Sequence, residues 1–333
     1  MSSSYRLRNW PEYERALEAR GSLEVFFPAE TLACWRAEAS ALARRPRGHP
    51  QVYSDVAITA VLALSAYCHL GLRETVGFAR SLFSVLHLEL PVPDHTTLSR
   101  RRPRLPATLP VHPLTSPTQA LHLVVDSTGL QLVGEGSWQR HRCGDRARLT
   151  WTRHYVRVHL GVDEATGELR ALGVSTMRVT DGELLPALLA AVAAPLRQVT
   201  GDGAYDEWRC YDAVAARPER PRAVFPPPRA RRGRPRARIK QHGNCRRPPL
   251  DRDEHLRCIR RVGRRRWKVE VSYHRRSLSE TAISRWKRTF GDRLTARTFA
   301  GQSAEVFLCG ALLNRLLWLG RPEAYRVGGR SPP

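Results

Sequence analysis

The chain has 333 residues, 42% of them hydrophobic, so it can bury a sizeable core and is expected to form two domains. Lys and Arg total 55 against 31 Asp and Glu, and the formal net charge of +24 predicts a polyanionic partner. The seven cysteines include no C-x-x-C pair, which argues against a disulfide framework or a zinc knuckle. No apolar run reaches the roughly 18 residues of a membrane span, so we expect a soluble cytoplasmic protein with no membrane partner.

Residues 1–105 have the pattern of a helical region. Hydrophobic spacing and end signals predict helices over 11–20, 29–45, 56–70 (with Asp55 as N-cap) and 72–86. In the stretch PVPDHTTLSRRR that follows, Asp94 or Thr96 caps a short helix that ends in Arg100, Arg101 and Arg102. This order resembles a DNA-binding helix-turn-helix unit, although an ordinary helical bundle fits it equally well. The proline-rich residues 106–119 predict a linker.

Apolar runs of strand length begin after residue 120. We expect a buried strand in LHLVV, a turn at Ser127–Gly129 with a second short strand, and a hairpin around Gly167. The remaining signals predict a helix capped by Asp181, a strand ending at Asp202, a helix from Asp206, a strand in RAVFPP and helices up to about Leu319. This order is typical of an α/β domain with mixed strand directions, here over 120–320. Residues 321–333 predict a disordered tail.

The positive charge is concentrated in one stretch. Between Arg229 and Lys268 the chain has 17 Lys or Arg against the three acids Asp251, Asp253 and Glu254. Only three of the 55 cations are lysines, a bias that genome composition explains as well as function does, but composition does not explain the uneven distribution. The stretch, which includes an Arg- and Pro-rich loop at 227–250, lacks the apolar face of a membrane-surface helix. Nucleic acid is therefore the expected partner.

Two acids follow predicted strands. Asp126 ends the run LHLVV, and Asp202 ends QVT. A carboxylate at the end of a strand points into the crevice where α/β sheets bind ligands, although a turn-forming Asp is a common alternative. Asp163, in the hairpin turn, and the helix caps Asp181 and Asp206 fit structural roles better. The charge of Asp126 follows a buried run and needs a partner, and a divalent cation would be one.

A third acid stands in YHRRSLSETAISRWK. On a helix, Tyr273, Arg276, Glu280 and Lys287 fall within one stripe about 60° wide. A solvated helix face with ion pairs between residues four apart is the alternative interpretation.

These four residues match the Y-x2-R-x3-E-x6-K signature of bacterial insertion-sequence transposases, and the chain resembles the DDE type, in the group called insertion sequences four and five. VVDSTGL and TGDGAYD resemble the motifs of the family's first and second acids, while LQLVGEGSWQRHR, TDGELLPALL and the N-terminal stretches NWPEYERALEARGSL and PDHTTLSRRR extend the resemblance over nearly the whole chain. Larger family members carry a β-rich insertion before the last acid, for which the loop at 227–250 is too short.

The resemblance implies an RNase H-like mixed five-stranded sheet flanked by helices, after an all-α DNA-binding region. It implies Asp126, Asp202 and Glu280 as catalytic triad and as ligands of two Mg²⁺ ions, which Mn²⁺ can replace. Tyr273, Arg276 and Lys287 would hold phosphates beside the metals, and Arg100, Arg101 and Arg102 would also bind DNA.

The implied function is a bacterial, nucleoid-associated transposase. It would bind the terminal repeats of an insertion sequence as a homodimer, hydrolyse phosphodiester bonds and join the 3′-OH ends to target DNA. A stand-alone Mg²⁺-dependent nuclease with the same core, or a catalytically silent DNA-binding repressor derived from a transposase, are the alternatives.

Overall fold

The computed structural model describes residues 4–37, 52–114, 119–132, 155–228 and 251–327. The chain divides into two compact units, one formed by 1–106 with 311–333 and the other by 107–310. The first boundary lies close to the expected one. The residues 311–320, which the sequence assigned to the α/β domain, instead cluster with the N-terminal unit.

The first unit contains helices together with a small sheet. Its helices are α1 (Trp10–Ala19), α2 (Ala29–Ala33), α4 (Asp55–Tyr67), α5 (Leu72–Val85) and α6 (His95–Arg101), with short 3₁₀ turns at Leu23–Val25 and Arg102–Arg104. Strand β1 (Ser4–Leu7) pairs antiparallel with β8 (Ala324–Val327). The region is therefore not all-α, and the expectation of a disordered tail is wrong for 324–327, because those residues find hydrogen-bond partners at the other end of the chain.

Helix ends in this unit follow ordinary capping chemistry. The Ser54 side chain, not that of Asp55, accepts the Ala57 N–H and caps α4, while Asp94 caps α6 through Thr96 and Thr97. The predicted helix over 29–45 is described only to residue 37, and α2 ends at Ala33. Within the described residues, no single helix is long and apolar enough to cross a membrane; α4 and α5 have the length and composition only as a pair, bent by 109°.

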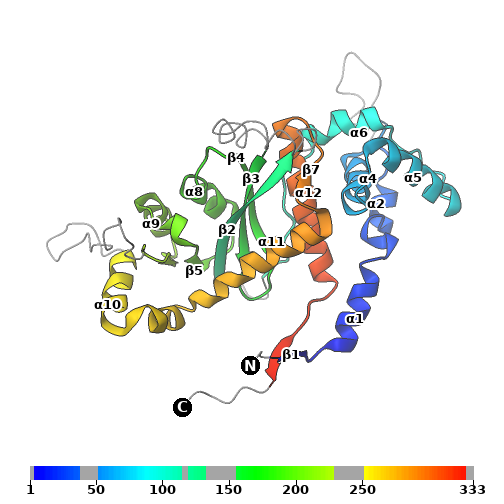
Figure 1. The fold of residues 1–333 in the computed structure, drawn as a ribbon. Helices are drawn as coiled ribbons and strands as arrows, with labels where there is room; N and C mark the ends of the chain where they lie inside the picture. The colour runs from blue at the N-terminus through cyan, green and yellow to red at the C-terminus, as the bar shows by residue number, and fades with distance from the viewer. Residues whose placement is uncertain (1–3, 38–51, 115–118, 133–154, 229–250, 328–333) are drawn as a thin grey trace, which may run out of the picture. The chain divides into compact units, whose positions relative to one another are not determined.

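The described part of the second unit forms a six-stranded mixed sheet (Figure 1). Its strands are β2 (Leu121–Leu132), β3 (Tyr155–Asp163), β4 (Leu169–Thr176), β5 (Leu196–Thr200), β6 (Arg222–Val224) and β7 (Arg293–Leu294). The order is β4-β3-β2-β5-β6, with β2, β3 and β4 antiparallel and β5 and β6 parallel to β2. The short β7, which pairs with Gln131 and Leu132 at the far end of β2, is the sixth strand beyond the five expected.

Strand β2 is continuous, so the predicted turn at Ser127–Gly129 is wrong. Its pairing with β3 runs unbroken from Leu123 opposite Asp163 to Gln131 opposite Tyr155. Ser, Thr and Gly favour turns in isolation, but a neighbouring strand that satisfies every backbone group overrides this local preference. The hairpin between β3 and β4 is confirmed, with Gly167 at φ +74° in its turn.

Helices cover both faces of the sheet. They are α8 (Asp181–Ala191), α9 (Trp208–Ala215), α10 (Asp251–Glu270), α11 (Ser277–Phe290) and α12 (Phe299–Trp318). Leu123 and Val125 of β2 share a buried core with Leu185 and Leu188 of α8 and with Tyr211 of α9. Helix α11 packs against β2 and β3. Because side chains alternate along β2, this packing directs odd-numbered residues to one core and even-numbered residues, including Asp126, to the other side.

Candidate active site

Asp126 and Asp202 both follow the point where the parallel pairing of β2 with β5 ends. The last register pair between β2 and β5 is Val124 opposite Thr200, and each acid lies two residues beyond it. Asp202 follows the end of β5 as predicted. Asp126 does not end its strand, since β2 continues to Leu132, but it stands where the parallel pairing ends. The two carboxylates therefore meet at one edge of the sheet.

Both oxygens of the Asp126 carboxylate are held by neighbours. The Ser127 N–H donates to Oδ1 at 2.9 Å, the Ser279 hydroxyl donates to Oδ2 at 2.9 Å, and Nη1 of Arg276 is 3.3 Å from Oδ2. The side chain is only 16% exposed, and this burial raises the pKa of Asp126. The contacts with Ser127, Ser279 and Arg276 oppose the increase, whereas the negative charge of Asp202 adds to it.

Asp202 caps the 3₁₀ turn Gly203–Tyr205. Its Oδ1 accepts the Ala204 N–H at 2.8 Å, which fixes the carboxylate at the mouth of the turn. Tyr205 is buried behind it, and its hydroxyl has no hydrogen-bond partner among the described residues. The pKa of Tyr205 is raised, first by burial and then by the charges of Asp181, Asp126 and Asp202. The negative charges of both Asp126 and Asp202 therefore act on this buried tyrosine.

Glu280 lies in the first turn of α11 and reaches Asp126 through one arginine. The Arg276 guanidinium forms an ion pair with the Glu280 carboxylate, and its other nitrogen contacts Asp126. The side chain of Glu280 is 57% exposed. The alternative interpretation of this stretch was an ion pair between residues four apart, and Arg276 and Glu280 form that ion pair. The same guanidinium also contacts Asp126, so it links the exposed Glu280 to the largely buried Asp126.

The signature residues do not all lie on one α-helix. Ser272 has φ +52°, in the left-handed region, and Tyr273–Arg276 form a 3₁₀ turn before α11 begins at Ser277. The predicted single α-helical stripe is wrong for Tyr273 and Arg276, because both lie in the 3₁₀ turn, which has about three residues per turn. The Tyr273 ring packs on Trp267 at 5.8 Å between centroids, and Lys268 Nζ lies 5.2 Å from its centroid.

Tyr273 nevertheless stands in the field of the acids. Burial raises its pKa, the positive charge of Arg276 opposes that increase, and Asp202 and Asp126 add to it. Lys287 is exposed near the end of α11, two helical turns after Glu280. The structure brings Asp126, Asp202, Tyr273, Arg276 and Glu280 together, whereas Lys287 shares only helix α11 with Glu280.

Two family models, both described as a transposase DDE domain, match the chain over residues 18–135 and 117–315. The second covers more than half of the chain and includes Asp126, Asp202 and Glu280. The chain belongs to the DDE transposase family. This confirms the resemblance to DDE-type transposases and, with the mixed sheet, the RNase H-like core. No solved structure matches the chain.

The three arginines predicted in the N-terminal region of this transposase differ in environment. Arg100 is exposed on α6. Arg101 donates to the Tyr53 carbonyl at 3.0 Å and pairs with Asp55, and Arg102 is only 9% exposed. Arg100 is the one of the three that is free to meet a phosphate. Arg102 is a poor candidate, because its side chain is buried in the helical unit.

Sequence reasoning missed Ser279, whose side chain is fully buried against Asp126. Its place directly before Glu280 was the only available signal. Asp181 was predicted as a helix cap, but Thr180 caps α8. The Asp181 carboxylate instead lies 3.3 Å from His159 Nδ1 and 3.5 Å from Arg157 Nη1. Asp181 therefore lies against His159 and Arg157 of β3 and does not cap α8.

Asp206, also predicted as a cap, is a buried ion-pair partner. Its Oδ1 accepts from Arg252 Nε and from the Tyr211 hydroxyl, both at 2.9 Å, while α9 begins after Glu207. Asp163 is confirmed in the hairpin turn, where it accepts from Ala165 and Thr166. Asp206 and Asp163 therefore support the fold and not the site.

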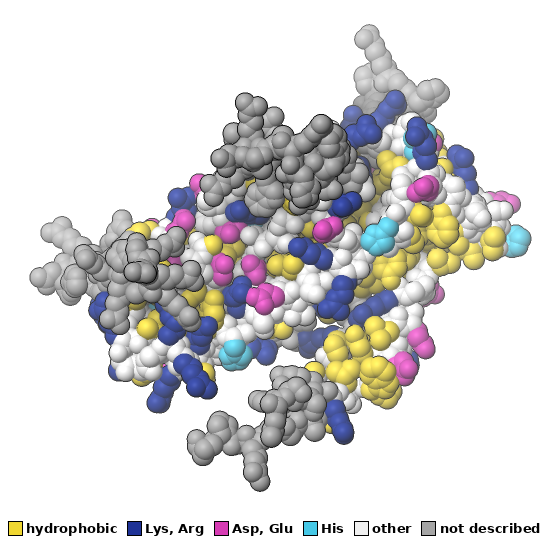
Figure 2. Space-filling model, in the orientation of Figure 1, with side chains coloured by type: hydrophobic (Ala, Val, Ile, Leu, Met, Phe, Trp, Pro, Cys, Tyr) yellow, Lys and Arg dark blue, Asp and Glu magenta, His cyan; other side chains and the backbone are white. Residues whose placement is uncertain are grey.

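The donor chemistry of the site suits a divalent cation. Among the described residues, no group of three or more His, Cys, Asp or Glu side chains is close enough to hold a metal ion. Yet the negative charge of Asp202 acts on Asp126, and a positive guanidinium already lies between Asp126 and Glu280. Carboxylate oxygens are the ligands that Mg²⁺ prefers. Members of this family typically use a divalent metal ion. Figure 2 shows a small group of acidic side chains with Lys and Arg beside it.

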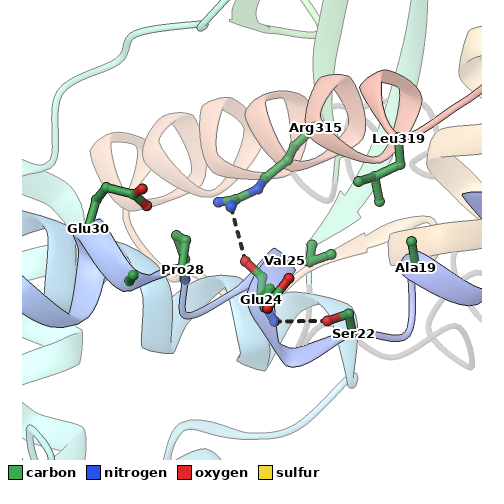
Figure 3. Close-up of a pocket in the computed structure, with 9 residues that line it drawn as sticks. Ala19, Ser22, Glu24, Val25, Pro28, Glu30, Arg315 and Leu319 are labelled. Carbon is green, nitrogen blue, oxygen red and sulfur yellow. Dashed lines mark hydrogen bonds between the residues drawn. The ribbon is translucent and has the colours of Figure 1, made fainter.

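A pocket of about 380 Å³ lies in the first unit and is separate from these acids (Figure 3). Arg315 of α12 crosses it to donate to the Glu24 carbonyl at 3.1 Å, and the Ser22 hydroxyl accepts the Glu24 N–H at 3.2 Å. All of its lining residues belong to the first unit, whereas Asp126, Asp202 and Glu280 belong to the second.

Proposed function

We propose that this transposase binds the ends of an insertion sequence, of the group called four and five, cleaves phosphodiester bonds with two divalent metal ions and transfers the 3′-OH ends to target DNA. The observation that carries the proposal is the single guanidinium of Arg276 between Asp126 and Glu280, with Asp202, like Asp126, two residues beyond the last pair of β2 with β5. Asp126 on β2, Asp202 after β5 and Glu280 on α11 are the three carboxylates that we assign to a metal-dependent phosphodiester site.

Each acid has a role in this proposal. Asp126, whose two oxygens face different partners, would contact both ions, Asp202 one of them and Glu280 the other. Two bound Mg²⁺ or Mn²⁺ ions supply an activated water and stabilise the leaving 3′ oxygen. Ser279 and Ser127 hold the Asp126 carboxylate in place, and burial strengthens both contacts because little solvent screens them.

Double-stranded DNA, as terminal repeats and as target, is the proposed partner. Tyr273, Arg276 and Lys287 would hold phosphates beside the acids, and Arg100 would do so from the helical unit, which we propose as a DNA-binding region of the helix-turn-helix type. Arg260, Arg261 and Arg265 are exposed along α10 and extend the basic surface. Such contacts give a strongly salt-dependent affinity. We expect a homodimer on paired DNA ends.

The test is cleavage of DNA that carries the element's own ends, comparing wild type with Glu280→Gln. Gln keeps size and helix propensity but removes the charge that a metal ion requires. Glu254→Gln is the matched control, because Glu254 is also 57% exposed and also pairs with a helical arginine, Arg257, but belongs to α10. We expect Glu280→Gln to bind DNA without cutting and Glu254→Gln to cut normally.

The alternatives are separated in the same assay. Cut ends that are never joined to a target plasmid would identify a stand-alone nuclease. Binding without cleavage by the wild type would identify a silent repressor. Equal cleavage by wild type and Glu280→Gln would remove Glu280 from the triad and return it to a solvated helix face.

A further inference from the structure

Arg276 occupies the position between the acids that a cation would take. Its Nη1 is 3.3 Å from Asp126 Oδ2, its Nη2 pairs with Glu280 Oε1, and its side chain is 23% exposed. These two carboxylates come from residues 150 positions and four positions away in the chain. One guanidinium thus pairs with two acids and reduces the repulsion between their negative charges.

We propose that Arg276 holds the Asp126 and Glu280 carboxylates only until metal binds and is then transferred to a DNA phosphate, so that metal binding and DNA binding are coupled through this side chain. The inference rests on the proposed function, in which both acids are metal ligands. It assigns Arg276 as a positioning residue in the metal-free protein and as a phosphate ligand in the loaded one.

Competition for oxygen atoms is the physical basis. Oδ2 of Asp126 already accepts from Ser279 and Arg276, so a cation that uses this oxygen must displace at least the weaker contact. Ser279 is fully buried and cannot move away, whereas Arg276 is partly exposed and has a long flexible side chain. A displaced guanidinium seeks another planar anion, and a phosphate is one that it binds with two parallel hydrogen bonds.

Coupling of this kind acts in both directions. If metal binding frees Arg276 for a phosphate, then a bound phosphate must raise metal affinity by the same factor. The metal-free protein would therefore bind DNA weakly at the site, and metal and DNA would assemble together.

The neighbouring Arg275 provides a matched control. It stands in the same 3₁₀ turn and carries the same charge, but its guanidinium pairs with Glu164 at the hairpin between β3 and β4 and does not contact Asp126 or Glu280 in the structure. Replacement of either arginine by Gln removes one positive charge from this turn. A difference between Arg276→Gln and Arg275→Gln therefore reports the contact with the acids rather than net charge.

The first experiment titrates Mn²⁺ into the DNA-free full chain by calorimetry. We expect Arg276→Gln to bind Mn²⁺ about tenfold more tightly than wild type, because the half-buried contact with Asp126 no longer competes, and Arg275→Gln to stay within about twofold. Asp126→Asn should abolish binding. Tighter binding is a gain that partial unfolding cannot produce. Should Arg276→Gln fail to fold, Arg276→Lys, which lacks the planar fork of two donor nitrogens, is expected to bind Mn²⁺ more tightly than wild type by a smaller factor.

The second experiment measures the affinity for a short duplex with and without Ca²⁺ at constant ionic strength. Wild type and Arg275→Gln should gain about fivefold or more with Ca²⁺, and Arg276→Gln should gain clearly less. The proposed exchange of Arg276 is wrong if Arg276→Gln binds Mn²⁺ no more tightly than Arg275→Gln does. It is also wrong if Arg276→Gln gains as much DNA affinity from Ca²⁺ as wild type does. If Asp126→Asn instead binds Mn²⁺ as tightly as wild type does, the metal site of the proposed function is refuted.

Discussion

The hydroxyl of Ser279 lies 2.9 Å from Oδ2 of Asp126, across 153 positions of sequence. The same hydroxyl also lies 2.8 Å from the Arg276 carbonyl oxygen, to which its single hydrogen can be donated instead. Ser279 is fully buried, so this small side chain fixes the start of α11 against the middle of β2. The distance between Glu280 and Asp126 therefore depends on a residue that carries no charge.

Ser279→Ala should weaken the site without unfolding the protein. The hydrogen bond from Ser279 orients the Asp126 carboxylate and lowers its pKa, so its loss leaves that carboxylate less well held. We expect about a tenfold loss in cleavage rate, in line with the loss of one hydrogen bond to a charged group. Ser277→Ala is the control, because Ser277 is exposed at the start of the same helix. Equal losses in the two variants would contradict the role of Ser279.

His122 should make stability depend on acid pH. The ring is buried beside Thr200 and Gln198, and burial lowers its pKa from 6.5 to about 4. Between these values the unfolded chain binds a proton that the folded chain does not. Stability is therefore lost as pH falls through this window, by up to about 1.4 kcal/mol per pH unit.

Urea unfolding at about pH 7 and about pH 5 measures how the free energy of unfolding changes with pH in wild type and in His122→Gln. The wild type should lose more stability than the variant between the two pH values. His274→Gln, at an exposed position, should behave like wild type. A variant with the full wild-type slope would show that His122 does not titrate in this way.

Gly263→Ala should destabilise the protein even though there is room for a methyl group. Gly263 breaks α10 at φ +80° and ψ 158°, and a Cβ added there would meet nothing within 4 Å. That backbone region is almost restricted to glycine, so Ala should cost about 1–3 kcal/mol in strain.

Gly77→Ala is the opposite control in the same denaturation measurement. Gly77 is exposed inside α5, also has nothing within 4 Å of an added Cβ, and has no positive φ. Alanine at this position should stabilise the protein by roughly 0.5–1 kcal/mol, because alanine loses less backbone entropy on folding than glycine does. If both changes acted in the same direction, backbone strain at Gly263 would not be the cause.

Removal of β8 should expose β1. The strands pair from Ser4 with Val327 to Leu7 with Ala324, and the Arg8 guanidinium lies 5.3 Å from the centre of the Tyr325 ring. A chain that ends at Arg321 should therefore lose amide hydrogen-exchange protection at Tyr5 to Leu7, because a single strand without a partner is not stable. A chain that ends at Val327 keeps β8 and should keep the protection. Protection that persists without β8 would mean that β1 is held in another way.

The sequence determined the identity of the acids and the order of the elements. Periodicity and capping chemistry are local, so α5, the β3–β4 hairpin, the strands before Asp202 and after Arg222, and the cap by Asp94 could be read from the residues alone. The spacing around Glu280 and the strand before Asp126 predicted a site whose residues lie within the range of the family match.

Only the tertiary structure decided how those acids are held. The continuity of β2 through Ser127–Gly129 depends on its pairing with β3. The nearness of Asp126 to Asp202 depends on the pairing of β2 with β5, and strand β8 forms because it pairs with β1 at the other end of the chain. The Ser279 contact and the bridge through Arg276 join residues 153 and 150 positions apart. Propensity and spacing act over a few residues, whereas these contacts arise only when distant elements pack, which is why no local pattern could predict them.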